Sequence, residues 1–173
     1  MDLVVLVDEN DRELGTMPKA LVHTDNTPLH RAFSVFLFND EGEVLVQQRN
    51  KNKKTWGGIW SNSCCGHVSP GEKYETAVER RASQELGAKI QNLVKVANYR
   101  YRFERDGIVE NEICPVFRAT ISGELSPDPE EVEAWKWLGW KEWLEILKND
   151  HADEWSPWCK EEVLLLDPPK GLS

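Results

Sequence analysis

One stretch of the chain, residues 66–88, reads GHVSPGEKYETAVERRASQELGA and predicts a capped helix that follows a short polar turn. Ser69 is a typical N-cap, Pro70 is favoured at the first helical position, and Glu72 stands where it would complete a capping box. Gly87 is a typical stop signal, because glycine readily adopts the left-handed conformation that ends many helices. We therefore predict a helix that begins at Pro70 and ends just before Gly87.

Segments of strand character lie on both sides of this helix. The predicted strands cover residues 2–7, 31–38, 43–48, about 93–104, about 110–121 and about 132–138. Two more helices are predicted at about 140–148 and 157–166, and a loose tail at 167–173. Strands first, one central helix, strands again and C-terminal helices indicate a mixed α+β fold. No repeat or linker divides the chain, so we expect one domain over residues 1–173.

The composition limits the classes of function. The chain has 173 residues, 40% of them hydrophobic, and a net charge of -9, which argues against general binding of nucleic acid or anionic membranes. Its longest apolar run, 33–38 with Ser34 inside it, is far shorter than the roughly 20 residues of a membrane span. The first residues lack the basic start of a signal peptide, and four cysteines are too few for a disulfide scaffold. We expect a cytoplasmic protein with reduced thiols.

Histidines and paired carboxylates form the first candidate site. His23, His30 and His67 lie in or beside short polar segments, and Glu110 and Glu112 are spaced so that they share one face of a strand. Three imidazoles with two carboxylates suit zinc or manganese better than calcium. The alternative is surface histidines beside a solvated strand face.

A pair of thiols forms the second candidate site. Cys64 and Cys65 directly precede Gly66 and His67. A thiol near a metal or cationic groups can become reactive or donate a proton, whereas a buried cysteine often serves only as a small apolar residue. The residues themselves leave both interpretations open, including which of the two cysteines would act.

Local positive charge and tryptophan complete the candidates. Residues 49–54, RNKNKK, carry four cations in an acidic chain, which suits a phosphate or diphosphate, although a solvated loop would look the same. Trp158 follows Ser156 and Pro157, and an indole face can stabilise a cation. Packing is the default interpretation for most of the eight tryptophans.

The stretch at 66–88 resembles the Nudix box, G-x5-E-x7-R-E-U-x-E-E-x-G-U, where U is a bulky apolar residue. Five positions match: Gly66, Glu72, Arg80, Glu85 and Gly87. Arg81 and Gln84 replace glutamates that hydrolytic members use to hold magnesium and activate water. The resemblance therefore implies the Nudix fold, with its sheet, central helix and C-terminal helices, but not diphosphate hydrolysis.

Further motifs are similar to one branch of that superfamily, the type 1 isopentenyl-diphosphate Δ-isomerases. In order along the chain they are HTDNTPLH at 23–30, WSNSCCGH at 60–67, GIVENE at 107–112 and SPW at 156–158. Several matches in the family's order are much more specific than the box alone. They span the chain from Lys19 to Trp158.

The resemblance implies a role for each matching residue. The ligands of one manganese or zinc ion would be His23, His30, His67, Glu110 and Glu112. Glu85, with the main-chain carbonyl of Cys65, would hold one magnesium ion on the substrate diphosphate. Cys65 and Glu112 would be the catalytic acid and base, with Tyr101 beside Glu112 and Tyr99 as its nearby competitor. The diphosphate would contact Lys19, Arg49, Lys53 and Arg81, and Trp158 would cover the hydrocarbon.

The implied reaction is the isomerisation of isopentenyl diphosphate to dimethylallyl diphosphate through a tertiary carbocation, a step of isoprenoid biosynthesis. The implied partner is this small prenyl diphosphate, and we predict no nucleic acid, membrane or protein partner. Two alternatives remain at this point: a Nudix-type diphosphohydrolase, and a non-catalytic module that binds a diphosphate or a metal. The missing box carboxylates count against the first, and the combination of a thiol, a carboxylate pair and three histidines counts against the second.

Overall fold

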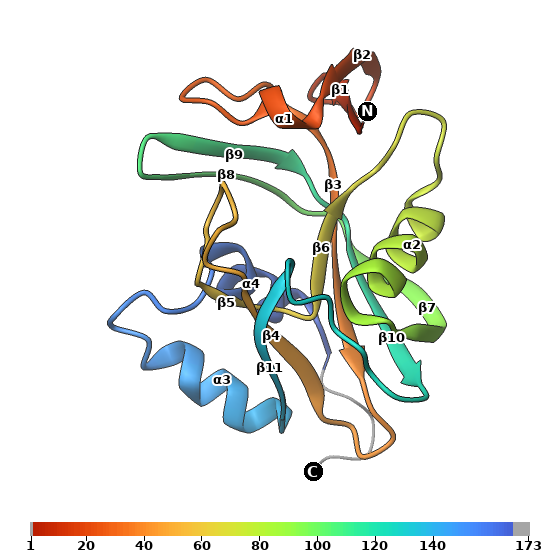
Figure 1. Cartoon of the computed structure of the whole chain (residues 1–173), viewed down its shortest axis with the longest axis vertical. Coiled ribbons are helices and arrows are strands. Elements are labelled where there is room, and N and C mark those ends of the chain that lie inside the picture. Colours follow the sequence, from red (N-terminus) through yellow and green to blue (C-terminus); the bar gives the residue numbers. More distant parts are fainter. Residues whose placement is uncertain (1, 168–173) are drawn as a thin grey trace.

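Strand β3 (His30–Phe38) runs through the centre of the molecule in the computed structural model, which describes residues 2–167. It pairs antiparallel with β1, β4 and β6, and parallel with β9 and β10 (Figure 1). The remaining pairs, all antiparallel, are β2 with β1, β5 and β11 with β4, β7 with β10, and β8 with β9. Five partners on one strand bring distant parts of the sequence into register.

The other strands are short to medium in length. Their bounds are β1 (Leu3–Val7), β2 (Glu13–Pro18), β4 (Val44–Arg49), β5 (Trp60–Ser61), β6 (Cys64–His67), β7 (Lys89–Ala97), β8 (Arg100–Arg105), β9 (Ile108–Ile113), β10 (Val116–Ser122) and β11 (Val132–Leu138).

Helices cover both faces of the sheet. On one face, α2 (Tyr74–Leu86) packs over alternate residues of β3, including Phe33 and Leu37. On the other face, α3 (Trp140–Lys148) and α4 (Pro157–Glu162) pack over Phe36 and Phe38 (Figure 1). The short α1 (Lys19–Val22) and a 3-10 turn, η1 (Val163–Leu165), complete the elements. The mixed α+β class is confirmed, and among residues 2–167 no helix is long and apolar enough to cross a membrane.

The central helix begins later than predicted. Residues 70–72 form a turn, and α2 starts at Tyr74 with Lys73 as its N-cap residue. Glu72 does accept a hydrogen bond from the backbone N–H of Ser69 at 2.9 Å, as a capping box requires. However, the same carboxylate also accepts a hydrogen bond from Arg80 of α2 at 2.7 Å. The Ser69–Glu72 pair therefore closes a turn that packs against α2, and it does not form the first turn of the helix. The end at Gly87, with φ of 61°, is as predicted.

Two predicted strands are each divided in the structure. The segment predicted at about 93–104 belongs to β7 and β8, and the segment at about 110–121 belongs to β9 and β10. Prolines and turns supply the breaks, as at Pro115 between β9 and β10. The last predicted helix divides into α4 and η1, while β2, α1, β5 and β6 were not predicted. Of the predicted tail, residues 168–173 lie outside the described part of the chain.

Candidate active site

A cavity of about 530 Å³ gathers most of the predicted site residues. Its lining includes Lys19, His23, Arg49, Lys53, Cys65, His67, Arg81, Glu85, Tyr101, Glu110, Glu112 and Trp158. His30 lies beneath this wall and is fully buried. The segments that supply these side chains are far apart in sequence but meet around β3.

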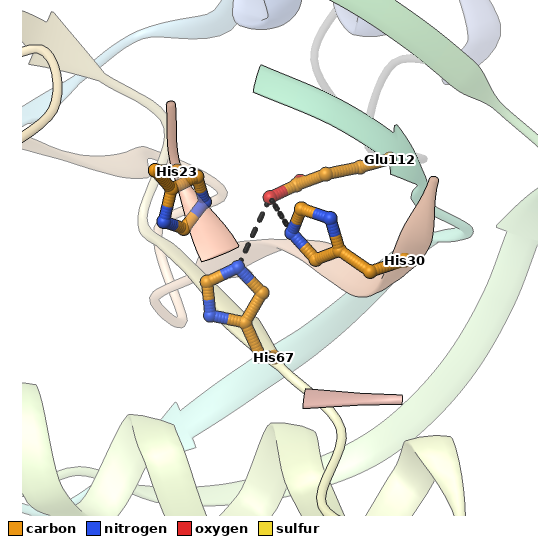
Figure 2. A group of neighbouring side chains, drawn as sticks. All are labelled: His23, His30, His67 and Glu112. Atoms are coloured by element: carbon orange, nitrogen blue, oxygen red, sulfur yellow. Dashed lines mark hydrogen bonds and ion pairs between the residues drawn. The ribbon is translucent and has the colours of Figure 1, made fainter. Parts of the chain in front are cut away.

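Three histidines and one carboxylate form a compact cluster in the wall (Figure 2). Register explains the arrangement, since His30 on β3 lies opposite Glu112 on β9, and His67 on β6 lies opposite Ala32 on β3. The Oε1 atom of Glu112 is 3.1 Å from Nε2 of His67 and 3.3 Å from Nε2 of His30. One ligand atom from each residue of His23, His30, His67 and Glu112 lies within 4.8 Å of the others.

Glu110 lies at the edge of this cluster. Its Oε2 atom is 3.1 Å from Nε2 of His23, and both Glu110 and Glu112 face the cavity. Their i, i+2 spacing on β9 thus places the two carboxylates on one face of the strand.

The ring nitrogens fit a metal ion better than they fit one another. Nε2 of His23 and Nε2 of His30 lie near carboxylate oxygens but not in hydrogen-bonding geometry, and these two atoms and Nδ1 of His67 are buried without a hydrogen-bond partner among the described residues. Nδ1 of His30 lies 2.9 Å from the carbonyl oxygen of Pro28, an outer contact that orients the ring and directs Nε2 inward. Buried imidazoles with a free nitrogen beside carboxylates are the donor set of a transition-metal site.

The charge states within the cluster differ. Burial opposes the charged form of His30, but its pair with Glu112 raises its pKa above the ordinary value. Burial lowers the pKa of His67 to about 4, and the hydrogen bond with Glu112 opposes this only in part. Both rings contact the same oxygen of Glu112, so His30 and His67 share a single negative charge.

Cys65 faces the cavity from β6. Its Sγ atom lies 3.2 Å from Oδ1 of Asn62 and 3.4 Å from the hydroxyl oxygen of Ser34. Burial, and then the charge of Glu162, raise the pKa of the Cys65 thiol well above its ordinary value. The group is therefore a thiol that can donate a proton into the cavity. Cys64 points elsewhere, with its Sγ atom 3.4 Å from Oε2 of Glu85.

The structure separates the two tyrosines. The Tyr101 hydroxyl donates a hydrogen bond to Oε2 of Glu112 at 2.5 Å, within the cavity. Tyr99 donates to Oε2 of the exposed residue Glu161, also at 2.5 Å, and does not line the cavity. Tyr101 is therefore the tyrosine beside the predicted catalytic carboxylate.

An indole forms part of the cavity wall. The ring of Trp158 stacks on Tyr101 with centroids 5.8 Å apart and an interplanar angle of 17°. Its Nε1–H donates to the hydroxyl oxygen of Ser61 at 3.0 Å, which fixes the ring plane. A fixed indole face at this position can stabilise a positive charge on a bound molecule.

Basic side chains meet at one end of the cavity. Burial, with the charges of Arg81 and Lys53, lowers the pKa of Lys19, as expected where like charges gather. No sequence motif includes Glu131, which forms ion pairs with Lys53 and, at 3.6 Å, with Arg81. Glu131 reaches them because β11 pairs with β4, a contact that no local pattern predicts.

Glu85 connects the basic end to α2. It is buried, forms an ion pair with Arg81, and has Nε2 of Gln47 3.4 Å from its Oε2 atom. Gln84, which replaces a box glutamate, accepts a hydrogen bond from Arg81 at 3.3 Å. The site therefore offers one buried carboxylate where a hydrolytic Nudix box offers several. Carboxylates suit magnesium, which usually takes one or two of them together with substrate phosphates.

Comparisons with known proteins show the family of this chain. The model of the NUDIX domain matches residues 28–159. The chain is 46% identical over 168 residues to the isopentenyl-diphosphate Delta-isomerase of Mycolicibacterium vanbaalenii, covering 96% of this chain and 92% of that protein. It is 47% identical over 159 residues to the protein of the same name from Paenarthrobacter aurescens, covering 91% and 86%.

Solved structures show the same fold. DR0079 from Deinococcus radiodurans superposes with a TM-score of 0.74 at 19% identity, covering 94% of this chain and 98% of that one. A MutT NUDIX hydrolase from Burkholderia pseudomallei gives a TM-score of 0.64 at 20% identity, covering 80% and 98%. At these identities the likeness concerns the fold alone.

Proposed function

Since this chain belongs to the isopentenyl-diphosphate Delta-isomerases, a family with the NUDIX domain, we propose that it converts isopentenyl diphosphate to dimethylallyl diphosphate. The observation that carries this proposal is one cavity that holds a thiol, Cys65, a carboxylate, Glu112, and an indole, Trp158. Moving the double bond of an unactivated alkene requires an acid, a base and a surface that stabilises a cation. A cytoplasmic location stays a prediction.

The double bond of isopentenyl diphosphate moves by one position, so one proton is added and another is lost. Removing a proton first would leave a carbanion with nothing to delocalise it. Adding a proton first gives a tertiary carbocation, and loss of a proton from the neighbouring carbon then completes the shift. This order requires an acid and a base at two sides of a flat hydrocarbon.

We assign the acid to Cys65 and the base to Glu112. Their segments, β6 and β9, both pair with β3, and the raised pKa of Cys65 keeps its proton in place until it is transferred. Tyr101 holds Oε2 of Glu112, and Trp158 supplies a face against which the cation is stabilised and shielded from water. Such a face contributes about 2 kcal/mol when it is desolvated.

The basic end of the cavity takes the diphosphate. Lys19, Arg49, Lys53 and Arg81 would bind its oxygens, so that binding energy positions the reacting carbons. The ions proposed are manganese or zinc on His23, His30, His67, Glu110 and Glu112, and magnesium on Glu85. When bound, the first would orient Glu112 and shift its proton affinity, and the second would neutralise charge on the diphosphate.

The proposed isomerisation is tested by following the exchange of protons between substrate and solvent. Purified protein, isopentenyl diphosphate, magnesium and manganese or zinc are incubated in D₂O and followed by proton NMR. Dimethylallyl diphosphate that carries deuterium is the expected product. Phosphate release without a shifted double bond would identify a diphosphohydrolase, and an unchanged spectrum with verified metal content would identify a binding module; either result overturns the proposal.

The assignment of Cys65 has its own control. Cys65→Ala should lose at least a hundredfold in kcat, the range expected when a positioned proton donor is removed. Cys159→Ser changes another buried thiol outside the cavity, whose Sγ atom lies 3.2 Å from the carbonyl oxygen of Ser156, a contact that serine preserves. A Cys65→Ala protein that retains most of its turnover would refute the role of Cys65.

A further inference from the structure

A carboxyl group lies buried behind the Cys65 thiol, in a part of the core that the proposed mechanism does not use. Glu162, the last residue of α4, has a relative exposure of 0%, and its Oε2 atom has no hydrogen-bond partner among residues 2–167. Its helix, which also carries Trp158, packs in a core of apolar side chains. A buried polar atom without a partner is uncommon enough to require an explanation.

Short contacts connect this carboxyl group with the cavity. Oε1 of Glu162 lies 4.0 Å from Sγ of Cys114, and the Ser34 hydroxyl oxygen lies 3.4 Å from that sulfur. The same hydroxyl oxygen lies 3.4 Å from Sγ of Cys65, and the Cys65 thiol donates its hydrogen to Oδ1 of Asn62 at 3.2 Å. Ser34 and Cys114 are buried as well, so the chain of contacts is closed to bulk water until it reaches Cys65.

Several features favour the neutral form of Glu162. Burial raises its pKa well above the ordinary range, the contact with Ser34 opposes this only in part, and the carboxylates of Glu112 and Glu161 add to the rise. A carboxylic acid has one hydrogen to donate, whereas a carboxylate can only accept.

The direction of the hydrogen bonds depends on this one hydrogen. If Glu162 donates toward Cys114, then Cys114 donates to Ser34 and Ser34 donates to the sulfur of Cys65. The Cys65 proton is then not shared with Ser34, and the sulfur receives a hydrogen bond as it becomes a thiolate. If Glu162 were ionised, the chain would run the other way, and the Ser34 hydroxyl would compete for the Cys65 proton.

We propose that Glu162 is a positioning residue which, as a neutral acid, directs the Cys114–Ser34 chain so that Ser34 donates to Cys65 and its proton remains available to the substrate. The role in turnover rests on the proposed function, but the direction of the chain does not. Of Glu162, Cys114, Ser34 and Cys65, only Cys65 lines the cavity.

Infrared spectroscopy tests the charge state of Glu162 without any activity assay. At neutral pH the protein should show the carbonyl band of a buried, protonated carboxyl group. The band should be absent from Glu162→Gln and retained in Glu161→Gln, the exposed neighbour on the same helix. If the spectrum of Glu162→Gln matches that of the unchanged protein in this region, Glu162 is ionised and the proposal is overturned.

Kinetics test the effect on Cys65. Glu162→Gln retains a donor and should keep kcat within about threefold, whereas Glu162→Leu, which cannot donate, should lose about tenfold in kcat with KM unchanged. Equal losses in both variants, or wild-type kcat in Glu162→Leu, would contradict the proposal.

Alkylation of Cys65 by iodoacetamide, measured by mass spectrometry, provides a readout that needs no turnover. Cys65 is the only one of the four cysteines that is not fully buried, so its modification can be followed separately. The rate should fall about tenfold in Glu162→Leu and stay within about threefold in Glu162→Gln. These alkylation rates test the role of Glu162 even if the unchanged protein shows no isomerase activity. Equal rates in all variants would overturn the proposal.

Discussion

Replacing Tyr101 by phenylalanine removes one hydroxyl group and leaves the aromatic stack of the cavity wall in place. The lost contact is the 2.5 Å hydrogen bond to Oε2 of Glu112. A hydrogen bond to a charged group contributes about 1.5–3 kcal/mol. Because His30 and His67 contact only Oε1, Oε2 would then lack a hydrogen-bond partner among residues 2–167 to hold its orientation toward the substrate. The free energy at stake corresponds to a fall in kcat of about tenfold to a hundredfold.

Tyr99→Phe is a matched control, because it removes a hydrogen bond of the same length, 2.5 Å, to an exposed carboxylate outside the cavity. Its kcat should stay within about twofold of the unchanged protein, since exposed polar pairs contribute about 0–1 kcal/mol. Initial rates of isopentenyl diphosphate conversion give kcat and KM, and thermal melts followed by circular dichroism check the fold. If Tyr101→Phe retains kcat within twofold, or if Tyr99→Phe loses as much, the assignment of Tyr101 is refuted.

Three further predictions concern packing, pH and metal. Gly66→Ala should destabilise the protein by about 1–3 kcal/mol in urea unfolding, because a Cβ there would lie 3.0 Å from carbons of both Phe33 and Arg81; an unchanged midpoint would contradict this. The hydrogen bond from Arg80 lowers the pKa of Glu72, so Glu72 contributes stability above its unfolded pKa of about 4.3 and loses it as pH falls through the lower folded value. The stability gap between the unchanged protein and Glu72→Gln, measured from pH 7 to 3, should therefore shrink with acidification, and a gap that widens would refute the reasoning. Chelation with excess EDTA should lower the melting temperature, and added manganese or zinc should restore it, since a ligand that binds only the folded state stabilises it; a melting temperature indifferent to both would argue against the histidine metal site.

Local patterns predicted the regular parts of this fold well. The strand at 132–138 and the helix at 140–148 were placed with the bounds of β11 and α3, because a bounded apolar segment and an amphipathic period depend on neighbouring residues only. The predicted start of α2 was wrong because it depends on a residue farther along the chain. Ser69 and Glu72 do form their local pair, but the side chain of Arg80, on the next turns of the helix, takes part in the same contact.

The candidate site depended on resemblance, and the residues outside the motifs show why. The motifs supplied every residue of the histidine cluster, and the structure places these residues together. Glu131 and Glu162 belong to no motif; the first reaches Lys53 through the pairing of β11 with β4, and the second reaches the thiol of Cys65 only through Cys114 and Ser34. Such contacts arise from tertiary packing, so sequence patterns carry no signal for them.

The position of β3 has a consequence for how the molecule opens. Because β3 is paired with five strands and buried from both faces, its amides should exchange with solvent only upon global unfolding, together with those of β6 and β10. α1 and the loop 50–58 form the wall at the basic end of the cavity. They are joined by side-chain contacts such as the one between Nζ of Lys54 and the carbonyl oxygen of Ala20, at 3.2 Å. The Cys65 thiol and the histidine cluster are therefore expected on the part of the protein whose amides exchange most slowly, while α1 and the loop 50–58, which border the basic end of the cavity, are expected to open at a lower free energy. Local opening of this wall would admit substrate and release product, while the groups that move protons keep their places.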